Sequence, residues 1–366
     1  MARTIKDSLA EQVVKSTRRT APIEREVKKI ETDDLIPSGS TLLNLACSDN
    51  PYGAYGLGKI VTLPGTSSAG KTLLMLTTFA EAHKLKRIDE YDFIYDDVEA
   101  ALEFDLAYLF GKGVANRIKE PPQGCSNTIE HFKSNILTLA EKGKPFIYCL
   151  DSFDALSSDD ELEKEMRKAL AMAKSEEAAK KIAGSYGTEK AKMAGQVLRM
   201  VKQELQRTNS LLIMIQQVRQ NLNAGPFGQK YTTSGGEAPF FYSSHCVWLS
   251  KIEPLKKQGR KIGSRVKADV KKNKLTGKLR DVEFDIFYDH GVDDIGSMID
   301  FMVDEKVWAK SGNNINAIEF NISLNRTALI THIEENNLEP RLIRAVATAW
   351  KTIEDGLLLR RKPRYD

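Results

Sequence analysis

The residues with the clearest chemical potential in this sequence lie between positions 65 and 72. The stretch reads GTSSAGKT and fits the pattern G-x-x-x-x-G-K-[ST]. Its glycines let successive backbone N–H groups turn toward one anion, and a helix that follows adds the positive end of its dipole. The lysine would reach the outer phosphates of a nucleotide, and the threonine hydroxyl would bind Mg²⁺. The predicted cradle comprises Gly65, Thr66, Ser67, Ser68, Ala69, Gly70, Lys71 and Thr72.

Two acidic stretches could complete this site. Asp151 ends the apolar run FIYCLD, and a carboxylate at the end of such a strand faces the ligand crevice, so it is the predicted second magnesium ligand. Asp154 is interpreted as a surface residue. The run FIYDDVEAAL carries three acids, of which one would polarise an attacking water while the others cap the next helix. Spacing alone does not choose among Asp96, Asp97 and Glu99.

These side chains need strands and helices to position them. Near-continuous apolar runs such as LLIMI (211–215) are typical of strands covered on both faces. Helical stretches separate the earlier strands, which predicts a right-handed βαβ series, whereas the later strands are closely spaced and antiparallel. The expected class is therefore α/β with a mostly parallel central sheet flanked by helices. The predicted strands are 59–64, 92–97, 145–151, 210–217, 245–251 and 281–290.

Composition limits the class of protein. The 366 residues, 41% of them hydrophobic, suffice for one large α/β domain with small additions. No apolar run is long enough for a membrane span, the first twenty residues lack the apolar core of a secretion signal, and four cysteines are scattered without metal-ligand spacing. We therefore expect reduced thiols, a cytoplasmic location and no membrane partner. The net charge of +4 does not prove a nucleic-acid partner, although residues 251–280 and the end of the chain are densely basic.

Two segments do not fit the alternating pattern. Residues 5–18 are predicted to form a short amphipathic helix, which a charged connector follows. Residues 157–205 are charged and alanine-rich with helical periodicity and one break at 184–188, and the simplest interpretation is two solvated helices joined by a turn. After residue 296 a small helical appendix ends the chain.

The fragment QQVRQNLNAGPFGQKYTTSGG (216–236) narrows the interpretation. An apolar strand ends in Gln217, a loop rich in Gly, Asn and Gln follows, and Thr-Thr-Ser-Gly-Gly closes it. This resembles the second DNA-binding loop of the RecA family of homologous recombinases. Three other stretches are similar to family segments in the same order: residues 36–72, which end in the phosphate-binding P-loop (65–72), RVKADVKKNK (265–274) and residues 282–312. The divergence suggests a phage-encoded or otherwise remote member, of the UvsX kind, and for a phage-encoded protein the location would be the host cytoplasm.

The resemblance implies a domain organisation. Residues 1–32 would be an N-terminal helix and linker for subunit polymerisation. Residues 33–295 would be the RecA-like ATPase core, with DNA-binding loops at about 157–192 and 219–236. Residues 296–366 would be a small C-terminal α-rich subdomain with a basic tail.

The resemblance also implies roles for the residues around the bound nucleotide. Glu99 matches the catalytic glutamate of the family, and Asp97 is the fallback. Gln217 would sense the γ-phosphate, although it could also be a polar cap on a buried strand. Tyr108 matches an adenine-stacking tyrosine and could equally be a core aromatic.

Further matches concern assembly. Lys272 and Lys274 match a pair that reaches across a subunit interface to the ATP of the neighbour, unless this is only a solvated basic hairpin. One extra residue in this stretch leaves the register open, so Lys271 could replace Lys272. Phe240 departs from the family because bacterial members usually carry a basic residue there. The basic tail departs too, because bacterial recombinases end in acidic residues.

For DNA, the resemblance suggests phosphate contacts through the second loop and base stacking or wedging by aromatic side chains at both loops. The candidate residues are Tyr186, Arg219, Phe227, Gly235 and Gly236.

The implied function is an ATP-dependent DNA recombinase. With ATP and Mg²⁺ it would self-associate into a helical filament on single-stranded DNA, pair with homologous duplex DNA and exchange strands, aided by single-strand-binding and loader proteins. A ring-forming helicase with the same core is an alternative, but it would need a larger N-terminal domain and an arginine finger. A non-catalytic accessory protein is another, against which Lys71, Thr72, Glu99 and Asp151 argue. A metabolic kinase would need an acceptor pocket, and the sequence offers no candidate for one.

Overall fold

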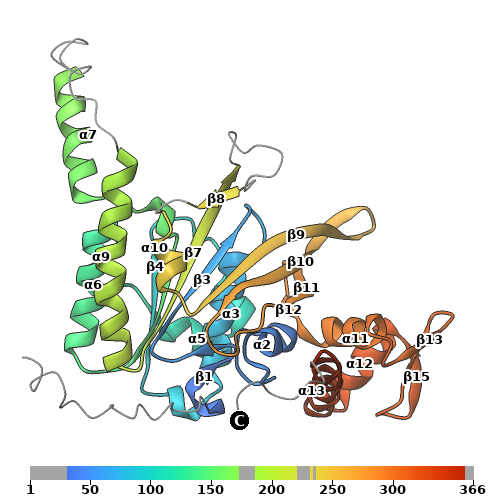
Figure 1. Ribbon diagram of the computed structural model, residues 1–366. Helices are drawn as coiled ribbons and strands as arrows, with labels where there is room; N and C mark the ends of the chain where they lie inside the picture. Colours follow the sequence, from blue (N-terminus) through green and yellow to red (C-terminus); the bar gives the residue numbers. More distant parts are fainter. Residues whose placement is uncertain (1–30, 173–185, 221–230, 234–235, 359–366) are drawn as a thin grey trace, which may run out of the picture. The chain divides into compact units, whose positions relative to one another are not determined.

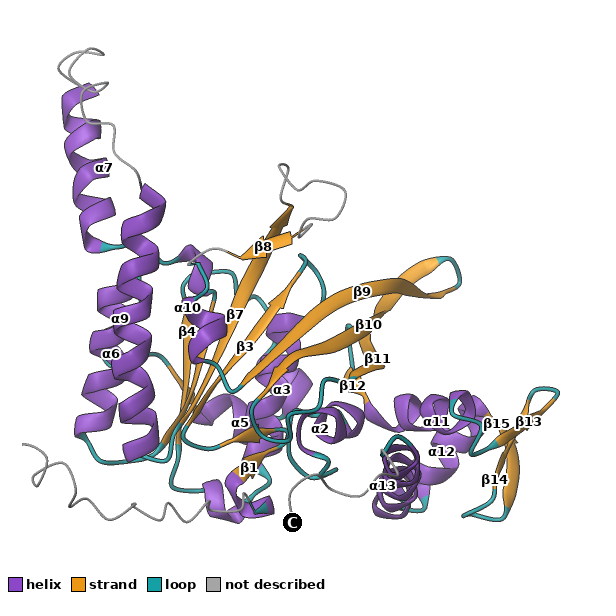
Figure 2. Ribbon diagram, in the orientation of Figure 1, coloured by secondary structure: helices purple, strands orange, loops and turns teal. Residues whose placement is uncertain are grey.

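The structure is a computed structural model that describes residues 31–172, 186–220, 231–233 and 236–358. From Thr32 onward the chain forms one compact unit. A ten-stranded sheet has the order β12-β11-β10-β9-β3-β7-β6-β4-β5, and β8 pairs with β7 (Figure 1 and Figure 2). The predicted α/β class is confirmed.

The strands of this sheet are β3 (Lys59–Gly65), β4 (Asp92–Asp97), β5 (Ile118–Lys119), β6 (Phe146–Asp151), β7 (Leu211–Gln220), β8 (Tyr231–Thr233), β9 (His245–Lys257), β10 (Arg260–Asn273), β11 (Asp281–Phe287) and β12 (Gly291–Asp293). Two short strands, β1 (Leu35–Ile36) and β2 (Tyr55–Gly56), pair with each other. The longer helices are α2 (Thr41–Ser48), α3 (Lys71–His83), α6 (Ile129–Glu141), α7 (Asp159–Met172), α9 (Tyr186–Arg207), α11 (Asp294–Asp304), α12 (Arg326–Glu335) and α13 (Glu339–Gly356), and the shorter ones are α4 (Leu106–Phe110), α5 (Lys112–Arg117) and α10 (Ala238–Tyr242).

The sheet has a parallel part and an antiparallel part. Strands β9, β3, β7, β6, β4 and β5 pair in parallel, while β9 to β12 pair antiparallel, as the spacing of the later strands predicts. All six predicted strands are present. The sheet also contains β5, β8 and β12, which are too short for a periodicity signal, and the long strand β10, which the list of predicted strands left out.

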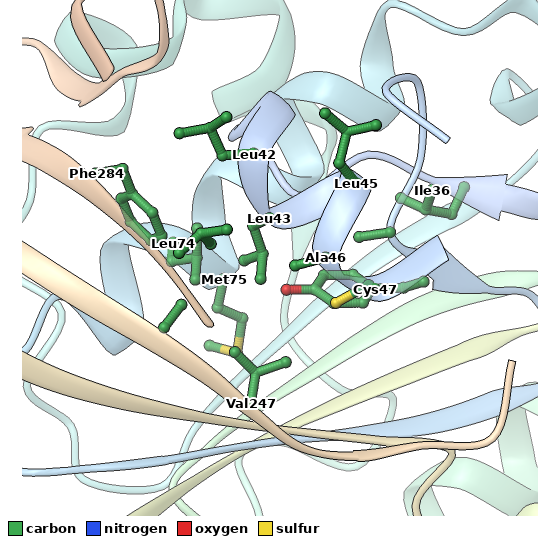
Figure 3. Packing of buried hydrophobic residues seen from close by; sticks show 14 of the residues in the cluster. Ile36, Leu42, Leu43, Leu45, Ala46, Cys47, Leu74, Met75, Val247 and Phe284 are labelled. Carbon is green, nitrogen blue, oxygen red and sulfur yellow. The ribbon is translucent and has the colours of Figure 1, made fainter. Parts of the chain in front are cut away.

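Apolar side chains on both faces explain the parallel part. Along β7, Leu211, Ile213 and Ile215 join one buried cluster, while Leu212 and Met214 join the other. A strand alternates its side chains between faces, so a continuous apolar run needs cover on both sides. Helices α2 and α3 cover one face, and α6 and α9 cover the other. Figure 3 shows the first cluster, where α2 packs on α3 and on side chains of β9 and β11.

The two helices predicted in the charged segment 157–205 are present as α7 and α9, but the expectation that both are solvated is wrong for α9. One face of α9 is buried in the second apolar cluster through Ala194, Val197, Leu198, Val201 and Leu205. Ser158 and Glu161 form a reciprocal cap at the start of α7, since each side chain accepts the backbone N–H of the other. α9 begins at Tyr186, so part of the expected break at 184–188 is helical. In Figure 1, α7 extends beyond the helices that cover the sheet.

Ion pairs tie the C-terminal elements to the sheet. Arg265 of β10 donates to Asp285 and Asp300, and Arg326 of α12 also donates to Asp300. Beyond α11, a small antiparallel sheet of β13 (Ala309–Ser311), β14 (Asn314–Ala317) and β15 (Ile322–Asn325) adds strands to the otherwise helical appendix. The predicted division at residues 32/33 and 295/296 remains a prediction.

From the sequence, we expect no membrane span and reduced cysteines. None of the helices in the described part of the chain is long and apolar enough to span a membrane. The four cysteines form no disulfide. The expected N-terminal helix at 5–18 and the basic tail from 359 lie outside the described residues.

Candidate nucleotide-binding site

The P-loop connects β3 to α3, and its two glycines are sterically required. A Cβ at Gly65, the last residue of β3, would lie 2.5 Å from the carbonyl oxygen of Leu249. Gly70 has a φ of 79°, and a Cβ there would lie 2.5 Å from Cδ1 of Ile286. Because α3 begins directly after Gly70, the loop delivers the positive end of the helix to the same place.

Lys71 turns back over this loop. Its Nζ donates to the carbonyl oxygens of Gly65 at 3.0 Å and Thr66 at 2.7 Å. Burial lowers the pKa of Lys71, and the nearby carboxylates of Asp151 and Glu99 oppose that shift. The ammonium group is therefore held at the cradle by protein oxygens that a phosphate would replace.

Thr72 and Asp151 meet as the sequence predicts. The Thr72 hydroxyl donates to Oδ2 of Asp151 at 2.7 Å, and the Tyr95 hydroxyl donates to the same oxygen at 3.1 Å. Burial raises the pKa of Asp151, and the charges of Glu99 and Asp97 add to that rise. A divalent cation would relieve this concentration of negative charge.

The donor set fits Mg²⁺. Magnesium prefers hard oxygen ligands and usually takes only one or two from the protein, with water and substrate phosphate completing its shell. Thr72 and Asp151 supply such oxygens. Among the described residues no group of three or more His, Cys, Asp or Glu could hold a metal ion by itself.

Two of the three candidate acids have structural partners. Asp96 is fully buried and accepts hydrogen bonds from Ser126 and from the Tyr148 hydroxyl. Asp97 accepts the backbone N–H groups of Ala101 and Leu102, which fixes the turn that follows β4. Both oxygens of each carboxylate therefore accept hydrogen bonds from the protein.

Glu99 has different partners. Its Oε1 accepts the Ser152 hydroxyl at 2.6 Å and Nε2 of Gln217 at 2.7 Å. Gln217 pairs with Gly65 in the β3–β7 register, and Asp97 pairs with Asp151 in the β4–β6 register. The registers therefore bring the strand ends to one edge of the sheet, where Glu99 faces the predicted γ-phosphate sensor.

Asp154 corrects the sequence interpretation. It was expected to be a surface residue, but it is half-buried and its Oδ2 accepts the backbone N–H of Gln217 at 2.6 Å. The reason is the short 3-10 turn Phe153–Ala155 after β6, which folds the carboxylate back against β7. Sequence spacing contains no signal for such a turn.

A β-bulge bears on the lysine register. Val270 pairs with Val247 and Lys272 with Cys246, so Lys271 is the extra residue in the ladder. Lys271 forms an ion pair with Asp269. This favours Lys272 over Lys271 as the first member of the lysine pair.

Lys272 and Lys274 gather at the C-terminal end of α10. Lys272 donates to the carbonyl oxygens of Phe240 and Phe241, and its Nζ lies 4.7 Å from the centre of the Phe240 ring. Lys274 donates to the Phe241 carbonyl at 3.4 Å. Burial lowers the pKa of Lys272 to about 8, with further lowering by Lys274 and Lys202.

The sequence of this chain is similar to that of one known protein family. The family model for the RecA N-terminal domain matches residues 7–293. The chain belongs to the RecA family. It is 32% identical to Protein RecA of Geobacter metallireducens over 279 residues, covering 76% of this chain and 74% of the relative. It is 31% identical to Protein RecA of Aquifex aeolicus over 289 residues (79% and 75%), and 29% identical to that of Wolinella succinogenes over 307 residues (84% and 80%).

The structure also describes Tyr108, the predicted adenine-stacking residue of this RecA-family chain. Its side chain is 70% exposed on α4, whose first turn Asp105 caps. The alternative interpretation as a core aromatic is therefore wrong. Stacking on adenine remains a prediction.

The predicted DNA-binding residues are only partly described. Tyr186 and Arg219 lie in α9 and β7, with their side chains outside the described part, while Phe227 and Gly235 lie outside it altogether. Gly236 is described. It has a φ of 68°, and a Cβ there would lie 3.1 Å from Cβ of Ala191 in α9.

Sequence reasoning missed three residues of the site: Ser152, Asp154 and Lys190. Ser152 follows the magnesium-ligand candidate directly, and this position next to a strand end was the available signal. Lys190 Nζ donates to the carbonyl oxygen of Asp154 at 3.1 Å, a contact between segments 36 positions apart that no motif encodes.

Proposed function

We propose that this protein is an ATP-dependent DNA recombinase that forms a helical filament on single-stranded DNA and exchanges strands with a homologous duplex. Membership of the RecA family supports a role in DNA recombination and repair. The observation that carries the proposal is the hydrogen bond between Glu99 and Gln217. It joins the candidate general base to the strand that leads into the predicted DNA loop.

ATP would bind with its phosphates in the Gly65–Thr72 loop. Lys71 would leave its two carbonyl partners for the outer phosphates, and Thr72 and Asp151 would hold Mg²⁺. The metal ion would neutralise charge on the phosphate oxygens. Tyr108 would stack on the adenine from its exposed position.

Hydrolysis needs a base near the γ-phosphate. Glu99 would accept a proton from water as the water oxygen forms a bond to the γ-phosphorus, and the bond from that phosphorus to the bridging oxygen would break, leaving ADP and phosphate. Ser152 orients the carboxylate, since its hydroxyl donates to Oε1. Gln217 would exchange its bond to Glu99 for one to the γ-phosphate, which moves the start of the DNA loop.

Lys272 and Lys274 would complete the site of the adjacent protomer. A cation supplied across the interface stabilises the charge that develops on the transferring phosphoryl group. A head-to-tail contact of this kind builds an open helix when the rotation does not close. Hydrolysis would then depend on assembly.

DNA would be held by the segments around β7, β8 and the start of α9, largely through phosphates and without sequence choice. The filament would test a duplex by base pairing. ATP hydrolysis would release the product.

The test combines hydrolysis with imaging. Phosphate release from ATP should require Mg²⁺ and rise when single-stranded DNA is added. Electron microscopy with a slowly hydrolysed ATP analogue should show extended helical polymers, and a homologous duplex should yield a joint molecule. Closed rings that unwind duplex DNA would support the helicase instead, and an absence of DNA-stimulated hydrolysis would support the accessory protein.

A further inference from the structure

A continuous series of contacts connects α9 to the candidate general base. Lys190 of α9 donates to the carbonyl oxygen of Asp154 at 3.1 Å. The Asp154 carboxylate accepts the backbone N–H of Gln217 at 2.6 Å. The Gln217 side chain then donates to Glu99 at 2.7 Å. Every step is a direct hydrogen bond between described residues.

The same turn of α9 touches the other end of the predicted DNA loop. Gly236 approaches Ala191 so closely that a Cβ would lie 3.1 Å away from Cβ of that residue. Lys190 and Ala191 are adjacent, so one turn of α9 contacts both Asp154 and the residue that follows the loop 221–235. A movement of this turn of α9 would therefore affect Gln217, through Asp154, and also Gly236.

We propose that Asp154 is a positioning residue that couples α9 and the β7–β8 segment to Glu99, so that occupancy of the DNA loops controls hydrolysis. This inference rests on the proposed function. A bond from a carboxylate to a backbone N–H is charge-assisted and directional. It fixes the backbone of Gln217, and the reach of the Gln217 amide to Glu99 depends on that backbone.

Asp154 also acts on the cradle through its charge. It is one of three carboxylates, with Asp151 and Glu99, that raise the pKa of Lys71 against burial. Substitution by Asn keeps an oxygen that can accept the Gln217 N–H and removes the charge. Substitution by Ala removes both, so the two variants separate the hydrogen bond from the charge.

The experiment measures the ratio of DNA-stimulated to DNA-free ATP hydrolysis in the full chain. Loss of one charge-assisted hydrogen bond corresponds to about a tenfold change in a coupled equilibrium. We expect Asp154→Ala to lower the ratio about tenfold and Asp154→Asn to lower it less, and the Kd for a fluorescent ATP analogue reports separately any change at the cradle. Tm of each variant reports any general loss of fold.

A double-mutant cycle identifies the route. If Asp154 acts through Gln217, then Asp154→Ala should change the ratio no further in a Gln217→Ala background. Additive effects of the two substitutions would overturn the inference, since Asp154 would then act elsewhere. An unchanged ratio in Asp154→Ala alone would overturn it as well.

Two variants on α9 test the first contact of this series, between Lys190 and Asp154. Lys190→Met should lower the ratio, because the bond to the Asp154 carbonyl is lost. Arg199→Met removes a positive charge from an exposed position of the same helix that lies outside the predicted DNA loop 157–192, and it should leave the ratio unchanged. Equal losses in both would indicate general attraction to DNA and would contradict the coupling.

The two proposals fail in different ways. If the unmodified chain shows no DNA-stimulated hydrolysis, the proposed function fails. If the unmodified chain is stimulated and the Asp154 and Lys190 variants are stimulated equally, only the coupling through Asp154 fails.

Discussion

Lys71 is buried and Lys272 is half-buried, and the charged groups around the two lysines have opposite sign. Burial lowers the pKa of each. Around Lys71 the carboxylates of Asp151, Glu99 and Asp154 offset this effect, whereas Lys274 and Lys202 add to it around Lys272. The positive charge of Lys71 is thus balanced by carboxylates of the same protomer. The positive charges around Lys272 would favour binding of an anion that another protomer holds. This difference is what a nucleotide site divided between two protomers would require.

The largest effect is expected from a substitution of Glu99, the candidate general base at the Lys71 site. Glu99→Gln keeps an oxygen for Ser152 and Gln217 but cannot accept a proton from water, so kcat should fall about 10²–10⁴-fold. Phosphate release at saturating ATP measures it. Asp97→Asn is the matched control: its N–H partners retain an acceptor, so kcat should change by about threefold or less. A larger loss in Asp97→Asn than in Glu99→Gln would assign the base to Asp97.

The second largest effect is expected from a substitution of Lys272. Lys272→Met should lower DNA-stimulated kcat about 10²–10³-fold, since a cation stabilising the transition state is lost. Mixing Lys272→Met protein with Glu99→Gln protein should restore part of the activity. An interface is intact where a Lys272→Met protomer binds the ATP and supplies Glu99, and a neighbouring Glu99→Gln protomer supplies Lys272. Random mixing should give about a quarter of the unmodified rate. No recovery on mixing, with polymers still present, would place both residues in the same protomer's site.

A pH profile sharpens the comparison further. A lysine is cationic below its pKa, and the pKa of Lys272 is lowered from 10.5 to about 8 by burial, with Lys274 and Lys202 lowering it further and Cys246 opposing. Its charge is therefore lost as pH rises through about 8. The alkaline limb of DNA-stimulated kcat/KM should fall about tenfold per pH unit above that value, because kcat/KM reports groups of the free protein.

Two arginine variants control this profile. Lys272→Arg keeps a cation at all accessible pH and should remove the alkaline limb. Lys271→Arg, at the bulge and paired with Asp269, should leave the limb in place. A limb that persists unchanged in Lys272→Arg would assign the titration to another group.

The smallest effect on chemistry is expected at Glu354, far along the chain in α13. Hydrogen bonds from Arg280 lower the pKa of Glu354 from 4.5 to about 2, and Lys278 contributes. A lowered carboxyl pKa stabilises the fold above pH 4.5, and this contribution is lost as pH falls toward 2. Glu354→Gln should lower the free energy of unfolding by about 2 kcal/mol at pH 7 and by much less near pH 2.

Denaturant unfolding at the two pH values measures this difference. Asp355→Asn on the exposed side of the same helix is the control and should change stability by less than about 0.5 kcal/mol. Hydrolysis at pH 7 should stay normal in both variants. A loss of hydrolysis in Glu354→Gln at full folding would link α13 to the nucleotide site.

Much of the fold and part of the site could be predicted before the structure. The P-loop, the end position of Asp151 and the two-sided burial of β7 follow from local spacing and apolar runs, which encode backbone geometry over a few residues. The choice among Asp96, Asp97 and Glu99 does not, because all three lie within four positions and only their distant partners distinguish them. Asp96 is held by Tyr148, a residue 52 positions away.

The amino-acid sequence by itself determined that a strand, a phosphate loop and a helix follow one another, since glycine conformations and side-chain periodicity are local properties. Only the tertiary structure decided that Asp154 bonds to Gln217 across 63 positions, that Gln217 bonds to Glu99 across 118, and that Lys271 lies in a bulge. These contacts depend on the registers of strands that are far apart in the chain. A register is set by the packing of the whole sheet, and a change of one residue in it would turn each side chain to the opposite face.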